Sequence, residues 1–189
     1  AEFHTGPGEV MLQYSVCSFD IFVEEVFTTL LNGAAVCIPP AAIHDGTAED
    51  LMRFAARHGV TIIDGFPYLL AELNKLPAIP GSVKLIISGG DVLRASYISR
   101  LKDSGTRIYN TYGPSETTVC SNYFRVDDAK PLADGTYPVG KAVKGVEVRI
   151  LNKRLRGVPK GTTGEICISG EGVARGYIGN PPEQKNFVT

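Results

Sequence analysis

The sequence is poor in the residues that build metal sites and disulfide frameworks, and it has no long apolar run. It has no tryptophan, three histidines and four cysteines in 189 residues. The cysteines show no CxxC pairing, so neither a zinc site nor a disulfide framework is indicated, and we expect reduced thiols in a cytoplasmic protein. No apolar run approaches the roughly 20 residues that a transmembrane helix needs. The cysteines are Cys17, Cys37, Cys120 and Cys167.

The composition also lacks a strong charge of either sign. The net charge is -1, with 21% charged and 43% hydrophobic residues, which is ordinary for a globular protein. Nucleic acid or an anionic membrane is therefore not expected as a partner. A chain of this length can build one good core, or one domain with a smaller appendage.

The first two thirds of the chain alternate between short apolar segments and segments with helical periodicity. This alternation predicts a parallel sheet covered by helices, formed by residues 10–126 after a flexible lead-in at residues 1–9. We expect the strands near Val36, Ile62, Ile86 and Ile108 to be neighbours. The predicted strands are residues 10–19, 34–39, 60–63, 83–87 and 107–109, and the predicted helices are residues 21–32, 47–58, 68–76 and 95–102.

The pattern changes after about Phe124. Residues 145–151 and 164–169 alternate between apolar and polar positions like strands with one buried face, and residues 156–161 between them are typical of a turn. No long helical pattern follows. We therefore predict a boundary near Asp127 and a small β subdomain over residues 127–189.

The stretch Asn110–Thr118 has the form of a ligand-binding junction. Gly113-Pro114 stops the preceding strand, Ser115 is a good helix N-cap, and Glu116 falls in the first helical turn. Open α/β sheets build their crevices at such strand ends. The spacing alone is equally compatible with an ordinary strand–turn–helix junction.

Four motifs together carry a resemblance to a known family. Asn110–Thr118 resembles the adenine-and-magnesium motif of adenylate-forming enzymes, particularly the amino-acid adenylation domains of nonribosomal peptide synthetases. Phe19-Asp20, Ser88–Asp91 and Gly164–Tyr177 are similar to further motifs of that family, in the same order along the chain. The resemblance implies an α/β flavodoxin-like subdomain with a mainly parallel sheet, followed by part of a small β-barrel.

The resemblance also implies roles for single residues. Asp20 would hold the α-ammonium of the amino acid, where a plain helix N-cap is the alternative. Glu116 would hold Mg²⁺. The alternative is that Glu116 is a first-turn glutamate that interacts favourably with the helix dipole. The implied side-chain pocket consists of Ile21, Glu24, Asp64, Ile86, Ser88, Thr111, Val119 and Cys120. The implied nucleotide contacts are Gly89, Gly90, Asp91, Asn110, Thr111 and Tyr112, of which Tyr112 could instead be a core aromatic.

Two members of that implied pocket are acidic. A carboxylate in a closed pocket costs several kcal/mol unless a cation or strong donors meet it. Glu24 and Asp64 therefore favour a basic amino acid such as lysine, ornithine or arginine as substrate.

Several segments of the family are not found in this sequence: the phosphate loop, the ribose-binding aspartate and the catalytic lysine. We therefore expect an internal fragment without activity of its own. Its parent would convert an amino acid and ATP to aminoacyl-AMP and pass the acyl group to the phosphopantetheine thiol of a peptidyl carrier protein. The alternatives are an excised specificity module, an acyl-CoA-synthetase-like ligase, or a regulatory nucleotide-binding domain.

Overall fold

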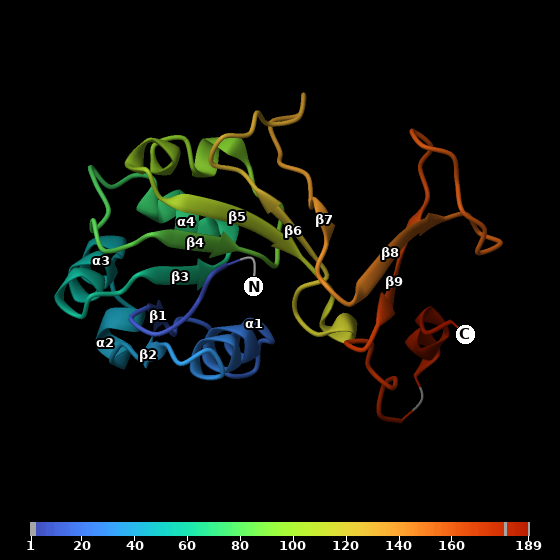
Figure 1. The fold of residues 1–189 in the computed structure, drawn as a ribbon, viewed down its shortest axis with the longest axis horizontal. Helices are drawn as coiled ribbons and strands as arrows, with labels where there is room; N and C mark the ends of the chain where they lie inside the picture. Colours follow the sequence, from blue (N-terminus) through green and yellow to red (C-terminus); the bar gives the residue numbers. More distant parts are fainter. Residues whose placement is uncertain (1–2, 180, 189) are drawn as a thin grey trace.

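A computed structural model describes residues 3–179 and 181–188 of the chain. It contains a seven-stranded sheet in the order β2-β1-β3-β4-β5-β6-β7 (Figure 1). The first five strands run parallel, while β6 and β7 are antiparallel to their neighbours. The mainly parallel α/β sheet predicted from the sequence is therefore confirmed. The strands are β1 (Val10–Leu12), β2 (Ala35–Cys37), β3 (Ile62–Gly65), β4 (Leu85–Ser88), β5 (Arg107–Tyr112), β6 (Asn122–Arg125) and β7 (Lys141–Ala142).

The order of the strands corrects one expectation. β1 lies between β2 and β3, because Met11 pairs with both Val36 and Ile62, so the strands of those two residues are not neighbours. The predicted adjacency of β3, β4 and β5 is confirmed. Strand order depends on the side to which each crossover turns, which the local sequence pattern does not encode.

The first predicted helix forms, with an irregular centre. It begins as α1 (Ile21–Val23) and continues through the π-helical turn η1 (Glu24–Thr28). Gly33 ends it with φ of 76°, where the Gly33 amide donates to Leu30 O and the Ala34 amide donates to Thr29 O. This pair of bonds is a Schellman C-cap, in which glycine is favoured because φ is positive.

The later helices are α2 (Ala41–His44), α3 (Ala48–Arg57) and α4 (Pro67–Leu73). A capping box precedes α3: Thr47 Oγ1 accepts from the Asp50 amide at 3.2 Å, and the Asp50 carboxylate accepts from the Thr47 amide at 3.3 Å. These two bonds satisfy amide groups that the first helical turn leaves unpaired.

The helix predicted at residues 95–102 is wrong. Two 3₁₀ turns stand there, η2 (Ala95–Tyr97) and η3 (Leu101–Ser104). The side-chain oxygen of Asn74 accepts from the amides of Arg100 and Leu101, at 2.8 and 3.2 Å. These two amide groups therefore donate to a distant side chain and not to the backbone carbonyl groups of a regular helix.

The sheet buries apolar side chains on both faces. Leu12, Ile63, Ile86 and Ile108 pack in one cluster with residues of α3 and α4, among them Leu70. A smaller cluster on the other face holds Met11, Ile62, Leu85, Ile87 and Tyr109. Since side chains alternate along each strand, residues of these two clusters mark the two faces.

The predicted lead-in is packed where it is described. Phe3 lies edge-on against Tyr109 with ring centroids 5.1 Å apart, and it also contacts Tyr123. Residues 1 and 2 lie outside the described residues. In the described part of the chain, no helix combines the length and apolarity needed to cross a membrane, and all four cysteines are free.

The small antiparallel sheet consists of β8 (Val146–Leu151) and β9 (Glu165–Gly170), as expected from their alternating pattern. It lies to one side of the large sheet, away from α3 (Figure 1). β7 and the buried Tyr137 lie beyond the predicted boundary near Asp127, yet they join the large sheet and its core.

Replacement of Leu70 by alanine tests the larger core. Leu70 is fully buried, so we expect Leu70→Ala to lower the free energy of unfolding by about 2–5 kcal/mol, measured by urea denaturation. The control is Leu31→Ala, since Leu31 is 82% exposed and its truncation leaves no cavity. Equal effects of the two changes would contradict the described core.

Candidate functional site

A cavity of about 260 Å³ opens at the carboxyl ends of β3, β4 and β5. It lies where the resemblance implies the binding site, since α1, β3, β5 and the loop after β5 all contribute to its walls. The implied residues that line it are Asp20, Ile21, Glu24, Asp64, Gly89, Gly90, Thr111 and Val119. Five further lining residues were not predicted from the sequence: Phe19, Phe66, Gly113, Pro114 and Ser115.

Two implied pocket residues lie on the other face of the sheet. Ile86 is fully buried in the core beside α3 and α4, and Ser88, two positions later on β4, shares its face. Asp64 pairs in register with Ile87, and Gly89 lines the cavity. The β4 positions toward the cavity are therefore one residue later than the predicted ones.

Cys120 also lies outside the cavity lining. Its thiol donates to Asn122 O at 3.2 Å. Burial, together with the nearby carboxylates of Glu24 and Asp64, raises the pKa of Cys120 to about 12. The thiol is therefore neutral at physiological pH and packs behind the cavity.

Only some of the residues implied to contact the nucleotide lie at the cavity. The side-chain nitrogen of Asn110 donates to Pro138 O at 3.0 Å, while its buried oxygen has no partner. Asp91 is exposed and accepts from the Val92 amide at 2.6 Å, and Tyr112 is half-buried. Of the implied nucleotide contacts, only Gly89, Gly90 and Thr111 line the cavity.

Gly89 and Gly90 hold positions that no larger residue could take. A Cβ on Gly89 would lie 2.6 Å from Thr111 Oγ1, and one on Gly90 would lie 2.8 Å from the Phe66 ring. Gly90 also has a φ of +82°. The turn after β4 therefore brings bare backbone to the cavity wall, as flat ligands require.

Asp20 is bound by a partner far away in the sequence. Its backbone is already helical, and its side chain makes no capping hydrogen bond, so the N-cap alternative is not observed. Instead Asp20 Oδ2 accepts from Ser115 Oγ at 2.5 Å. Ser115 is likewise not the predicted N-cap: Pro114 precedes the short 3₁₀ turn η4 (Ser115–Thr117).

Glu25 fixes the helix that carries Asp20 and Glu24. Its buried carboxylate accepts from the amides of Tyr14 and Ser15 at 3.0–3.1 Å and from the Gln13 side chain at 3.2 Å. These bonds join η1 to the segment after β1. The sequence alone gave no sign of this role, because most of these bonds come from backbone amides that only the fold brings near Glu25.

Three carboxyl groups line the cavity, those of Asp20, Glu24 and Asp64, and we name it the anionic cavity after them. Burial, followed by the charges of Asp20 and Glu25, raises the pKa of Glu24 to about 7. Burial, Glu24 and Glu25 also raise the pKa of Asp64 well above its usual range. Asp64 Oδ2 is buried without a hydrogen-bond partner, and no lysine, arginine or histidine is among the residues that line this cavity.

The loop after β5 has a strained backbone, and hydrogen bonds join it to the segment that follows β9. Thr118 and Val119 have φ of 63° and 62°, a conformation that is rare for β-branched residues and costs about 1–3 kcal/mol each. Thr118 Oγ1 donates to Gly172 O at 2.7 Å, and the Ala174 amide donates to Glu116 O at 2.7 Å. Segment 170–177 therefore fixes the loop that lines the cavity.

Glu116 is the predicted metal ligand on this loop. The Tyr177 hydroxyl donates to its carboxylate, and this bond is the main reason that the pKa of Glu116 lies below its usual range. The described residues contain no group of three or more acidic, histidine or cysteine side chains that could bind a metal ion alone. An ionised single carboxylate fits Mg²⁺, which keeps most of its ligands as water and phosphate oxygens.

The raised pKa of Glu24 predicts how stability changes with pH. The folded protein holds the Glu24 proton up to about pH 7, whereas the unfolded chain releases it near pH 4.5, so stability falls as the pH rises through this window. We expect Glu24→Gln to raise the free energy of unfolding at about pH 8 by roughly 2–3 kcal/mol and to change it little at about pH 5.

Urea denaturation at the two pH values measures this difference. Glu49→Gln is the matched control, because Glu49 is an exposed glutamate on α3. If the free energies of unfolding of wild type and Glu24→Gln differ by the same amount at every pH, the pKa of Glu24 is not raised in the folded protein.

Comparisons with known proteins agree with this geometry. The sequence matches the family described as "AMP-binding enzyme" over residues 1–178. It is 34% identical to bacitracin synthase 2 of Bacillus licheniformis over 90% of this chain, and 36% identical to cyclosporin synthetase simA of Tolypocladium inflatum over 94%. The chain spans only 6% and 1% of those two relatives.

Solved structures give the same result. A nonribosomal peptide synthetase, FmoA3 (S1046A), in an AMPPNP-bound form, superposes on 97% of this chain with a TM-score of 0.86 and 25% identity, and the chain covers 20% of it. The Vibrio cholerae adenylation domain AlmE, in complex with glycyl-adenosine-5'-phosphate, shares the fold with a TM-score of 0.81 at 23% identity, with 97% of this chain and 36% of AlmE covered. The resemblance predicted from the motifs is confirmed, and the chain belongs to the AMP-binding enzyme family.

Proposed function

We propose that this chain is the amino-acid- and adenine-binding part of an adenylation domain of a nonribosomal peptide synthetase. In the complete domain, the amino-acid carboxylate would attack the α-phosphorus of ATP, forming aminoacyl-AMP and releasing pyrophosphate. The acyl group would then pass to the phosphopantetheine thiol of a peptidyl carrier protein. Membership of the AMP-binding family and the peptide synthetases among its relatives support this proposal.

The cavity with unpaired carboxylates is the observation that carries the proposal. Asp20, half-buried and already positioned by Ser115, is suited to bind the α-ammonium of an amino acid. The fully buried Asp64 and the neighbouring Glu24 remain for the side chain. An amino acid with two cationic groups would therefore neutralise both parts of the cavity.

This arrangement supports a basic amino acid as substrate. An acidic side chain would repel the cavity carboxylates by some 4 kcal/mol per pair at about 4 Å, even at an effective dielectric of 20. An apolar side chain would leave Asp64 buried and unpaired or force it to hold a proton. The cationic side chain of lysine, ornithine or arginine would instead be attracted to these carboxylates.

The remaining implied contacts divide into two groups. Ile21, Thr111 and Val119 would form side walls for the substrate, and we add Gly89 on the β4 side. Ile86, Ser88 and Cys120 would shape the cavity from behind, because they do not line it.

The nucleotide would lie against the backbone of Gly89 and Gly90, near Tyr112. Glu116 would hold Mg²⁺ together with phosphate oxygens of the nucleotide, where the ion neutralises charge on the phosphates. Tyr177 would keep the Glu116 carboxylate oriented for this role. Reduced thiols and a cytoplasmic location remain predictions from the sequence.

The substrate class can be tested in the full-length protein by amino-acid-dependent pyrophosphate exchange. We expect lysine, ornithine or arginine to be preferred. Replacing both Glu24→Gln and Asp64→Asn should lower kcat/KM for the basic substrate by roughly 30-fold or more and relax selection toward leucine. Glu49→Gln serves as the exposed control. A wild-type preference for leucine, phenylalanine or glutamate over every basic amino acid would refute the assignment.

The isolated chain gives a second test of the proposal. We expect it to show no amino-acid-dependent pyrophosphate exchange above a Glu116→Ala control, since no cation lines the described cavity to meet the substrate carboxylate and the phosphates. Saturable exchange by the isolated chain would show that it carries all the groups needed for the reaction.

A further inference from the structure

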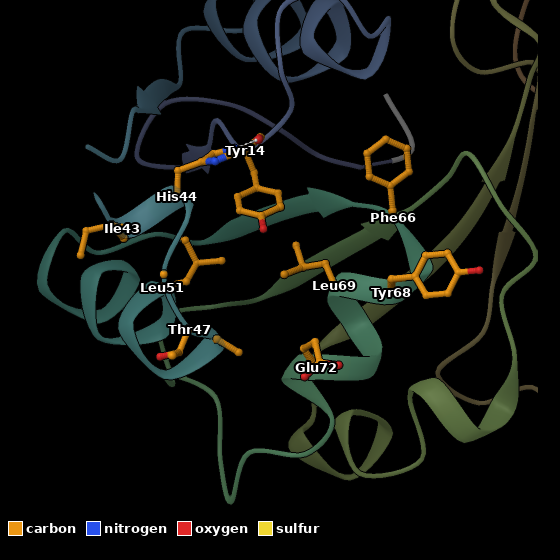
Figure 2. A pocket seen from close by; sticks show the side chains of 11 residues that line it. Tyr14, Ile43, His44, Thr47, Leu51, Phe66, Tyr68, Leu69 and Glu72 are labelled. Carbon is orange, nitrogen blue, oxygen red and sulfur yellow. Dashed lines mark hydrogen bonds between the residues drawn. The ribbon is translucent and has the colours of Figure 1, made fainter. Parts of the chain in front are cut away.

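A second cavity lies next to the first, at the point where the strand order reverses. β1 leads to β2 on one side and β3 leads to β4 on the other, so the crossovers after the neighbouring strands β1 and β3 run in opposite directions. In open α/β sheets the crevice at such a switch point is a common place for a ligand. A cavity of about 360 Å³ opens there, between Tyr14 after β1 and Phe66 after β3 (Figure 2). We name it the switch-point pocket.

The switch-point pocket offers aromatic and aliphatic walls. Tyr14 stacks on His44 with ring centroids 4.7 Å apart, and the Tyr14 ring lies between His44, Leu51 and Leu69 in Figure 2. The cavity volume falls within the usual range for small-molecule sites, about 300–1,000 Å³. Such walls suit a flat apolar group.

The charged side chains of this pocket are already engaged. His44 places one ring nitrogen 3.0 Å from Asp45 Oδ1 and the other 2.7 Å from Tyr14 O. Glu72 is paired with Lys75 at 2.5 Å. His44 and Glu72 are the acidic or basic residues among those that line the pocket, so the pocket offers no charged side chain that is without a partner.

Phe66 is the wall between the two cavities, because it lines both of them. Its ring packs against the Gly90 backbone and lies edge-on to Phe19, with ring centroids 5.6 Å apart. Glu24 and Asp64 line one of these cavities together with Phe66, and Tyr14 and Leu51 line the other.

We propose that Phe66 separates the substrate site from the switch-point pocket, and that without the Phe66 ring this pocket is a second subsite for a flat apolar group attached to a cationic substrate. The proposal rests on the proposed function in one respect: it takes the anionic cavity as the site of the amine. Phe66 is then a specificity-determining residue that limits how long a basic side chain the site accepts.

The test measures amine binding to the 189-residue chain and needs no catalysis. The probes are cadaverine, which has an amine at each end for Asp20 and the Glu24–Asp64 pair, and N-benzylcadaverine, which adds one aromatic ring. Affinities and the affected residues are followed by amide chemical shifts in NMR titrations. We expect wild type to bind cadaverine about tenfold more tightly than N-benzylcadaverine, since Phe66 leaves the ring no room.

Phe66→Ala should reverse this preference, so that N-benzylcadaverine binds at least about tenfold more tightly than cadaverine. The reason is that the aromatic ring of the probe can then enter an apolar pocket. N-Benzylcadaverine should also shift the amide signals of Tyr14, Thr47 and Leu51 in this variant alone. Phe66→Leu, which retains an aliphatic wall, should give an intermediate preference and guards against a variant that fails to fold. Tyr68→Ala is the matched control, since Tyr68 lines the switch-point pocket but not the anionic cavity.

The outcomes separate this inference from the proposed function. Cadaverine binding that is lost in Glu24→Gln, combined with an unchanged probe preference in Phe66→Ala, would overturn the second subsite and leave the cationic substrate intact. Absence of cadaverine binding by wild type and every variant would overturn both. A reversed preference in Tyr68→Ala as large as in Phe66→Ala would show that Phe66 is not the wall.

Discussion

The buried carboxylate of Glu25 is the contact on which the binding site depends. It joins the first helix to the chain after β1 through amide groups of Tyr14 and Ser15. Hydrogen bonds from several N–H donors favour the charged form of a carboxylate, which offsets part of the cost of its burial. The same charge lies beside Glu24 and contributes to the raised pKa values of Glu24 and Asp64. One side chain thus positions the first helix and adds to the effect of burial, the largest cause of the raised pKa values of Glu24 and Asp64.

The site is assembled from segments that are distant in the sequence and joined by few contacts. Ser115 reaches Asp20 across the mouth of the cavity, and Tyr177 and the Ala174 amide hold Glu116 from the far end of the chain. The left-handed backbone of Thr118 and Val119 is stable only because such contacts surround it. The small sheet therefore contributes to the binding site through its last segment, although its own strands lie to one side.

The strand order explains why two cavities are adjacent. The turns after β1 and β3 lie on neighbouring strands whose crossovers diverge, which leaves space between them. Phe66 extends from the end of β3 into that space and contributes to both cavities. The residue shared by the two cavities thus follows the acidic Asp64 by two positions, beyond the end of the strand.

Local sequence determined the elements that rest on local interactions. The apolar strands, the Thr47 capping box, the end of the first helix at Gly33 and the β8–β9 pair follow from periodicity and turn chemistry, and the motifs were sufficient to identify the family. Tertiary contacts decided the rest. Hydrogen bonds to Asn74 favour 3₁₀ turns over the helix predicted at residues 95–102. The direction of the crossovers places β1 between β2 and β3. The pleat of β4 directs Ile86 and Ser88 away from the cavity. The partners of Asp20, Glu25 and Glu116 could not be predicted, because no spacing rule connects a side chain to a donor that only the folded chain brings near.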